Sequence, residues 1–170
     1  SPGATFDLRA ETTTVTMPDG NSITMWGFGL DSQEVTIPGP FLEVPPADSS
    51  LTVNLTNNLP VPVSMVIPGQ PFALQPEFFI DDQGRRRVKS FTATTAPGAT
   101  RSYTWNNVQN GTYIYHSGTH PALQVHMGLY GGLKKDAAPG QAYPGVTYDS
   151  EAWLFYSEID PALHGTPTVA

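Results

Sequence analysis

Apolar and polar residues alternate along much of this chain, and the alternation predicts β-strands. In the segment 51–55, three apolar side chains fall on one face and polar side chains on the other, as expected for a half-buried strand. Residues 6–17 and 22–28 are β-branched runs on either side of a Pro-Asp-Gly turn, which predicts a hairpin. Further strands are predicted at 61–67, 90–95, 100–105, 111–115, 124–133 and 152–156. No window has a convincing 3.6-residue apolar period.

These elements predict an all-β fold, a sandwich or barrel in a single domain. The chain has 170 residues, enough for one hydrophobic core, and its 16 Gly and 17 Pro separate the strands. Two segments, 68–87 and 134–148, are predicted to be irregular, the second as a linker or wrapped arm. We expect the domain to span 1–160. A tail at 161–170 is expected to be weakly held unless a neighbouring subunit orders it.

Charge and composition argue against several functions. The chain has 15 acidic and 8 basic residues and a net charge of −7, which disfavours nucleic-acid binding because that affinity comes from Lys and Arg on phosphates. The basic cluster at 85–89 is interpreted as a solvated loop. No apolar run approaches the roughly 20 residues of a membrane span. The first residues do not resemble a signal peptide, so we expect one to be absent or already removed. The absence of Cys excludes disulfides, thiolate metal ligands and cysteine nucleophiles.

Three of the four histidines, His116, His120 and His126, fall within eleven residues. Neutral imidazole is a common ligand of copper and zinc. The three residues lie among strand-like aromatic residues and glycines, so they predict a metal-binding loop between two strands. A three-imidazole site with an open fourth position suits copper and would also accept zinc. The fourth histidine, His164, lies in the predicted tail and is expected to be solvated.

A structural role for the same histidines remains open at this stage. If 111–115 is a strand, His116 shares a face with Ile114, and a similar count places Gln124 and His126 on one face of the next strand. Whether those two faces meet depends on the register, which a sequence does not determine. The rings would otherwise be held by hydrogen bonds to the backbone.

Four stretches in chain order resemble the first cupredoxin domain of a multicopper oxidase, the family of laccase and ascorbate oxidase. The stretches are the Pro-Gly-Pro strand entry at 37–44, the strand and Asn-rich turn at 51–58, the signature at 111–133, and the segment at 151–158 that leads to a next domain in the family. The resemblance covers nearly the whole chain. It implies a Greek-key cupredoxin β-barrel, copper as the cofactor, and a secreted or periplasmic location.

The sequence also departs from this family at the copper ligands. A multicopper oxidase holds three coppers between two domains, each of which contributes two His-X-His pairs. Here Val66 and Pro68 replace the first pair, and the second is present in a stretched form as His116 and His120. The blue type 1 site needs a cysteine thiolate, and Val63 replaces its strand histidine. The resemblance therefore implies that this chain alone is not blue and does not reduce oxygen by the laccase route.

Three hypotheses follow from these observations. The first is a copper-binding cupredoxin-like domain with a histidine-only site at His116, His120 and His126, for which oxidoreductase activity stays open. The second is a non-catalytic structural or interaction domain of a larger multidomain copper oxidase. The third is a homo-oligomer that shares histidines between its copies, so the expected partners are a metal ion and further cupredoxin domains or copies of this chain.

Overall fold

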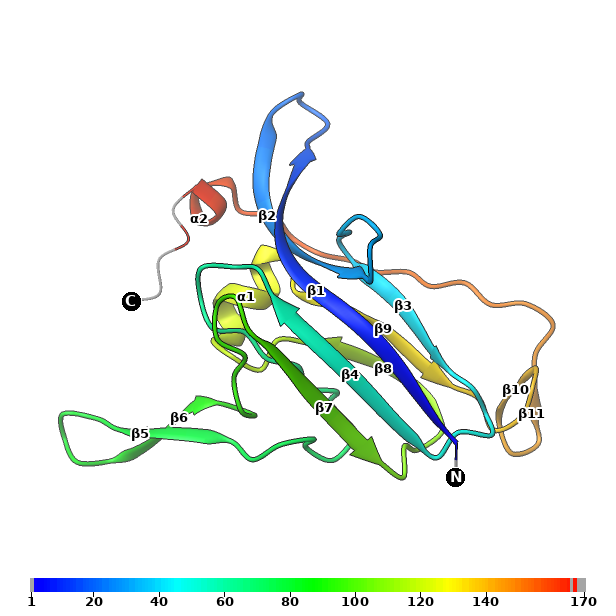
Figure 1. Cartoon of the computed structure of the whole chain (residues 1–170). Helices are drawn as coiled ribbons and strands as arrows, with labels where there is room; N and C mark the ends of the chain where they lie inside the picture. The colour runs from blue at the N-terminus through cyan, green and yellow to red at the C-terminus, as the bar shows by residue number, and fades with distance from the viewer. Residues whose placement is uncertain (1, 166, 168–170) are drawn as a thin grey trace.

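The main body of the molecule is a sandwich of two β-sheets (Figure 1). The computed structural model describes residues 2–165 and 167. The first sheet has the strand order β2-β1-β4-β7 and the second has the order β3-β9-β8. The strands of the first sheet are β1 (Gly3–Thr16), β2 (Ser22–Leu30), β4 (Ser50–Asn57) and β7 (Thr100–Asn106). Those of the second are β3 (Gly39–Val44), β8 (Gly111–His116) and β9 (Tyr130–Lys135). The predicted all-β sandwich is confirmed.

Each sheet contains one parallel strand pair, so the chain crosses between the sheets. β1 and β2 form the predicted antiparallel hairpin, but β1 runs parallel to β4. In the second sheet, β9 is antiparallel to β8 and parallel to β3. A tight turn cannot join parallel neighbours. The long connections therefore bring segments that are distant in sequence to the same end of the sandwich.

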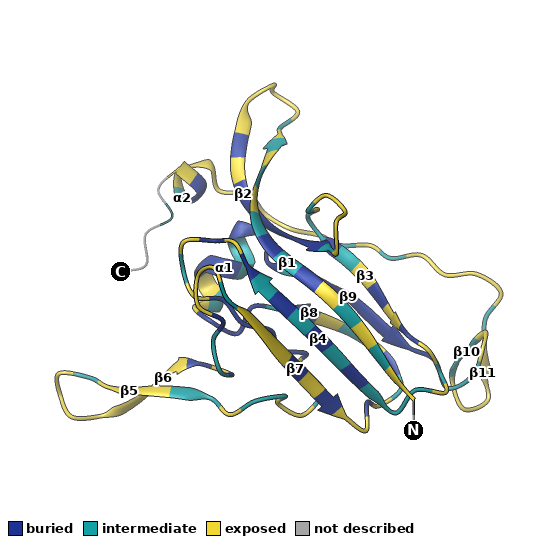
Figure 2. Ribbon diagram, in the orientation of Figure 1, coloured by how far each residue is buried: buried dark blue, intermediate teal, exposed yellow. Residues whose placement is uncertain are grey.

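The hydrophobic core lies between the two sheets (Figure 2). In β4 the buried and half-buried positions alternate strictly, so the period-two pattern of the sequence corresponds to the two faces of this strand. The largest fully buried side chains include Trp105, Tyr103 and Tyr115. Burial raises the pKa of the Tyr115 hydroxyl, which donates a 2.6 Å hydrogen bond to the Pro40 carbonyl oxygen.

The strand predicted at 124–133 is wrong in its first half. Residues Pro121–Met127 form the helix α1, and β9 begins only at Tyr130. Pro121 stands at the first turn, where its missing N–H costs no hydrogen bond, and Gly128 ends the helix with a positive φ of 121°. Because this helix has seven residues, it is too short to show a clear 3.6-residue period. The predicted shared strand face of Gln124 and His126 therefore does not exist.

Other predicted elements also differ from the structure. Segment 61–67 is not a strand and contributes only isolated bridges, from Val63 to Thr95 and from Val66 to His116. The irregular segment 68–87 contains β5 (Glu77–Ile80) and the start of β6 (Arg86–Ser90), which form a hairpin. The predicted linker includes the hairpin of β10 (Gln141–Tyr143) and β11 (Val146–Thr147). Segment 152–156 has no strand assignment, because no ladder partner lies beside it among the described residues.

The C-terminal region carries a short helix, α2 (Pro161–Gly165). His164 in this helix is 2% exposed, so the prediction that it is solvated is wrong. Residues 166 and 168–170 of the predicted tail lie outside the described residues. In the part of the chain that the structure describes, no helix has the length and apolar character needed to cross a bilayer.

Candidate metal site

His116 is the last residue of β8 and is half-buried. Its Nδ1 lies 2.8 Å from the carbonyl oxygen of Ser117. A carbonyl oxygen can only accept, so Nδ1 carries the proton and donates it, which leaves the lone pair of the ring on Nε2. Metal-binding histidines in proteins commonly have this arrangement. His116 therefore has a nitrogen suited to bind an ion.

The neighbours of His116 offer no comparable donor. The backbones of His116 and Val66 form an isolated antiparallel bridge, with N–O distances of 2.9 and 3.0 Å. An uninterrupted His-X-His pair beginning at His116 would place its second histidine at position 118, which is glycine. A Cβ atom on Gly118 would lie 2.8 Å from Cγ1 of Val66 and 3.2 Å from Oγ of Ser64. Val66 and Gly118 thus lie next to each other beside His116, and neither has a side chain that can bind a metal.

A buried network of hydroxyl and amide groups holds the loop at 117–119. The Ser117 hydroxyl donates to Oε1 of Gln124 at 2.5 Å, and Nε2 of Gln124 donates to the Pro62 carbonyl oxygen at 2.9 Å. The Thr119 hydroxyl donates to Ser64 Oγ at 2.8 Å, and the Gly118 N–H donates to the same oxygen at 3.1 Å. Most buried polar groups in folded proteins are paired in this way. The network fixes the direction in which the loop leaves His116, and the sequence gives no sign of it except three small hydroxyl residues in the loops.

His120 lies on the surface, at the N-cap of α1. Its φ of 41° and ψ of 60° place it in the left-handed region, and its side chain makes no capping hydrogen bond. The carbonyl oxygen of His120 accepts hydrogen bonds from the N–H groups of Leu123 and Gln124. The backbone of this residue therefore starts the helix, and its side chain is exposed.

His126 lies within α1, and its Nε2 is buried with no hydrogen-bond partner among the described residues. His116 and His126 both line an open groove of about 530 Å³, together with apolar side chains. The other lining residues are Met25, Ile114, Pro121, Ala122, Val125, Tyr130, Phe155, Tyr156, Ser157 and Glu158. A buried, unpartnered ring nitrogen is uncommon in a folded protein, and it is the feature of this groove that best suits a bound ion.

His164 approaches the same helix from α2. The His126 and His164 ring centroids are 5.8 Å apart. In His164, Nδ1 lies 2.7 Å from the Asp160 carbonyl oxygen and Nε2 lies 3.1 Å from the His126 carbonyl oxygen. Both ring nitrogens thus have backbone partners, and His164 holds α2 against α1. The sequence analysis missed this role, although the Asp-Pro pair at 160–161 is a helix-start signal.

The described residues do not fit a three-copper cluster. Within 2–165 and 167, no three His, Asp or Glu side chains are gathered closely enough to hold a metal ion together. Val66 and Pro68 have no donor atoms in their side chains, and the chain has no Cys for a blue copper site. His116 and His126 share a groove that His120 does not line. The assignment of all three histidines to one ion stays a prediction.

Comparison with known proteins identifies the family of this fold. The sequence model of the multicopper oxidase family matches residues 9–135. No match was found among curated proteins. Among solved structures, a multi-copper oxidase from Pseudomonas thermotolerans is similar, with a TM-score of 0.65 and 21% identity over 82% of this chain and 31% of that one.

Two further structures give the same result. The laccase from Botrytis aclada has a TM-score of 0.56 and 26% identity over 83% of this chain and 24% of that one. The blue copper oxidase from Nitrosomonas europaea has a TM-score of 0.59 and 23% identity over 79% and 39%. The chain thus spans well under half the length of each of these proteins. Since the family match covers most of the sandwich and includes β8 and β9, this chain is a cupredoxin-type domain and belongs to the multicopper oxidase family.

Proposed function

We propose that this chain is a non-catalytic cupredoxin domain that serves as a structural partner within a larger copper oxidase. The observation that carries this proposal is the pairing of Val66 with His116 beside Gly118. At the position where a copper-bearing domain of this family presents clustered imidazoles, this domain presents one imidazole, a valine and a glycine. The family implies copper for the complete assembly, and a secreted or periplasmic location remains the expectation for it.

The packing around Gly118 supports this proposal, because a histidine at 118 has no room. Val66, Ser64 and Phe91 all lie within 3.3 Å of the position of a Cβ atom there. Binding of a three-copper cluster by this domain would therefore require more than the replacement of single residues. The surrounding hydroxyl network would have to be rebuilt as well.

Oxygen consumption with a phenolic electron donor, measured after copper loading, tests this proposal. We expect the purified chain to consume oxygen at the same rate as its His116→Ala variant. A rate clearly above that of the variant would contradict the proposal. Circular dichroism of both proteins controls for folding.

A second candidate function is the binding of a single copper ion at the groove through His116 and His126, with His120 as the third ligand that the sequence predicts. Two observations favour this function. Nε2 of His126 has no hydrogen-bond partner among the described residues, and Nε2 of His116 keeps its lone pair because Nδ1 donates to the Ser117 carbonyl oxygen. Copper would supply redox or Lewis-acid chemistry there. The histidines of this chain would position the ion next to the apolar wall of the groove.

Isothermal titration with copper, and separately with zinc, tests the groove site. We expect about one copper per chain and an affinity at least about tenfold weaker in His126→Ala, because an imidazole ligand is lost. His120→Ala tests the third ligand in the same assay. Unchanged copper binding in both His116→Ala and His126→Ala would reject this site.

A further inference from the structure

The hairpin of β5 and β6 projects away from the sandwich (Figure 1). It forms a sheet of only two strands, so both of its outer edges lack a neighbouring strand over most of their length. Two-stranded sheets are marginally stable in water without further support. Four large apolar side chains of this hairpin are also exposed, namely Phe78 (41%), Phe79 (47%), Ile80 (65%) and Val88 (48%). This hairpin therefore has an unpaired edge and apolar side chains on both faces.

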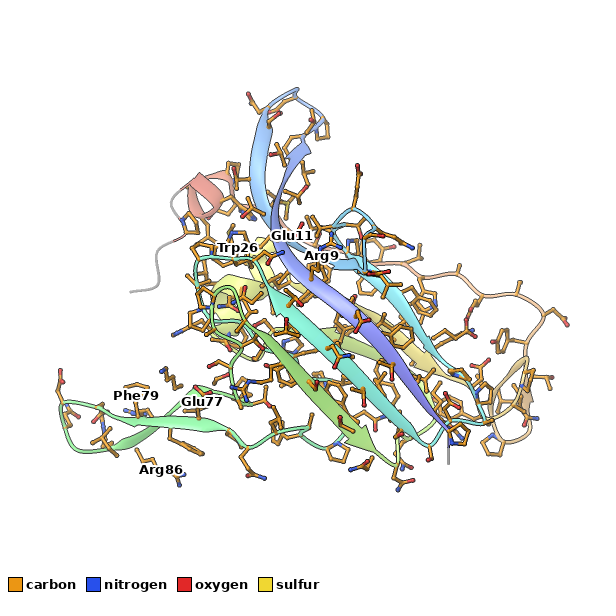
Figure 3. All side chains as sticks on the ribbon, viewed as in Figure 1. Arg9, Glu11, Trp26, Glu77, Phe79 and Arg86 are labelled. Carbon is orange, nitrogen blue, oxygen red and sulfur yellow. The ribbon has the colours of Figure 1, made fainter. Side chains whose placement is uncertain are left out.

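β6 carries most of the positive charge of the hairpin. Arg86 lies 3.5 Å above the Phe78 ring and has no carboxylate partner, and Lys89 forms no ion pair either among the described residues. Arg85 and Arg87 instead bond Asp81. Figure 3 shows Phe79 and Arg86 on opposite sides of the hairpin, so both of its faces combine apolar and polar groups. The free edge of β6 is thus a basic strand edge in an acidic protein.

An acidic extended segment lies elsewhere on the molecule. We name residues 149–160 the acidic arm, because it contains four carboxylates and no basic residue. Trp153 and Phe155 pack inward, whereas Leu154 and Tyr156 are 77% and 91% exposed. This alternation is that of a strand, yet no backbone hydrogen bond from another strand reaches 149–159 in the described structure. The arm is an extended segment with the side-chain alternation of a strand, but it belongs to no sheet among the described residues.

We propose that the acidic arm of one copy of this chain pairs with the free edge of β6 in a second copy. The result is a three-stranded sheet in which 154–158 runs antiparallel to β6. In this register Glu158 lies opposite Arg86, Tyr156 lies opposite Val88, and the exposed apolar side chains of both segments become covered. The two segments cannot meet within one copy, since the hairpin extends from one end of the sandwich and the arm runs along the opposite side (Figure 1). The contact joins two different surfaces, so it builds a ring or a chain of copies.

The charges of the hairpin favour a second copy of this chain over a lipid surface as its partner. Asp81 and Asp82 lie at the hairpin turn, where a membrane-inserting hairpin would need apolar or basic groups. Residues 154–158 of the acidic arm match the five residues of β6 in length, and Glu158 carries the charge opposite to that of Arg86. Antiparallel pairing of two arms with each other would instead bring like charges together, which destabilises a sheet.

Analytical ultracentrifugation of charge-reversal variants tests the proposal. We expect the wild-type chain to self-associate, and the association to weaken at high salt because charges at the protein surface are screened. Arg86→Glu and Glu158→Lys should each weaken association at least about tenfold, and an equimolar mixture of the two variants should restore it. Asp7→Lys, at an exposed position of β1 in the first sheet, serves as the matched control. A monomer at all concentrations, or a mixture that associates no better than each variant alone, would overturn the proposal.

Disulfide trapping gives an independent readout, because the chain contains no native Cys. Val88→Cys and Tyr156→Cys variants, mixed under mild oxidation, should form a disulfide-linked heterodimer, because these positions face each other in the proposed register and a disulfide requires Cα atoms about 4.4–6.8 Å apart. A mixture of Val88→Cys and Thr14→Cys is the control. Equal yields in the two mixtures would count against the contact. If the chain instead stays monomeric and binds anionic vesicles, the partner of the hairpin is a lipid surface and the proposal is overturned.

Discussion

At the scale of single residues, Lys134 shows how the C-terminal part of the chain is attached to the sandwich. Its Nζ donates to Glu151 Oε1 at 2.6 Å and to the Tyr148 hydroxyl at 3.0 Å, and the Tyr148 hydroxyl donates to Asp136. Burial alone would lower the pKa of Lys134, but these hydrogen bonds and the charges of Glu43 and Asp136 raise it. The ammonium group therefore stays charged and links β9 to the start of the acidic arm.

Replacement of Lys134 by Met should destabilise the protein by about 3 kcal/mol, because it leaves the largely buried Asp136 without its cation. This value is at the low end for a buried ion pair, since Glu151 is 40% exposed and partly solvated. Urea unfolding measures the change. Lys89→Met, which removes an unpaired exposed cation, should change the unfolding free energy by less than about 0.5 kcal/mol. Equal effects of the two substitutions would show that the ion network contributes nothing.

The buried tyrosines predict how stability depends on alkaline pH. Burial raises the pKa of Tyr103 from 10.0 to about 12, against the effect of its hydrogen bond with Thr95. Ionisation of Tyr103 is thus easier in the unfolded chain than in the folded one. The contribution of Tyr103 to the free energy of unfolding should be intact below about pH 10. It should be lost as the pH rises to about 12, which lowers that free energy by up to about 3 kcal/mol. Urea titrations in this range should show a smaller loss for Tyr103→Phe than for the wild type, and an identical loss would contradict this assignment.

At the scale of elements, α1 depends on a close approach at its C-terminal end. Gly128 has a φ of 121°, and a Cβ atom there would collide with the Trp26 carbonyl oxygen and lie 2.8 Å from Cγ1 of Ile37. The helix end is therefore held against β2 and the segment before β3. This contact determines where His126 lies relative to β8.

Gly128→Ala should cost about 2–4 kcal/mol of folding free energy, since it combines backbone strain with a steric collision. Thermal and urea unfolding measure the loss. Gly165→Ala is the matched control, because no atom of the described residues lies within 4 Å of the position of its Cβ. A Gly128→Ala variant as stable as Gly165→Ala would show that α1 can move away from β2 at little cost.

At the scale of the whole molecule, the acidic arm covers the outer face of the second sheet. The Trp153 and Phe41 ring centroids are 4.3 Å apart in an edge-on arrangement, and Trp153 lies directly over Gly132. The absence of a side chain at 132 is what allows the indole to reach the sheet. The arm is thus attached through side chains, and among the described residues no backbone hydrogen bond from another strand reaches 149–159.

Gly132→Val should displace the arm from the sheet, because even a Cβ atom would lie 2.7 Å from Cζ3 of Trp153. Chymotrypsin should then cleave within 153–156 at least about tenfold faster, while circular dichroism shows that the sandwich remains. Thr104→Val, on the exposed face of β7 in the other sheet, should leave the cleavage rate unchanged. Unaltered cleavage in Gly132→Val would mean that the arm is held by Lys134 alone.

The sequence predicts the parts of this fold that depend on local periodicity. The alternation in β4 and the hairpin of β1 and β2 follow from side chains that point to opposite faces, a property of the strand backbone itself. The helix α1 was missed because seven residues contain too few apolar positions to separate the two periods. Segment 152–156 was predicted as a strand from the same alternation that it does have, but a strand also requires a neighbour.

The candidate metal site likewise has features that the sequence predicts and features that depend on the tertiary structure. The sequence by itself determined which donors exist, namely four histidines and no Cys, and that Val66 and Pro68 cannot bind a metal. Only the tertiary structure decided that Val66 pairs with His116, that His116 and His126 share a groove, and that both ring nitrogens of His164 bond backbone carbonyls. The physical reason is that donor chemistry belongs to single residues. Proximity depends on strand register and on the packing of helices, which arise from contacts between segments distant in sequence.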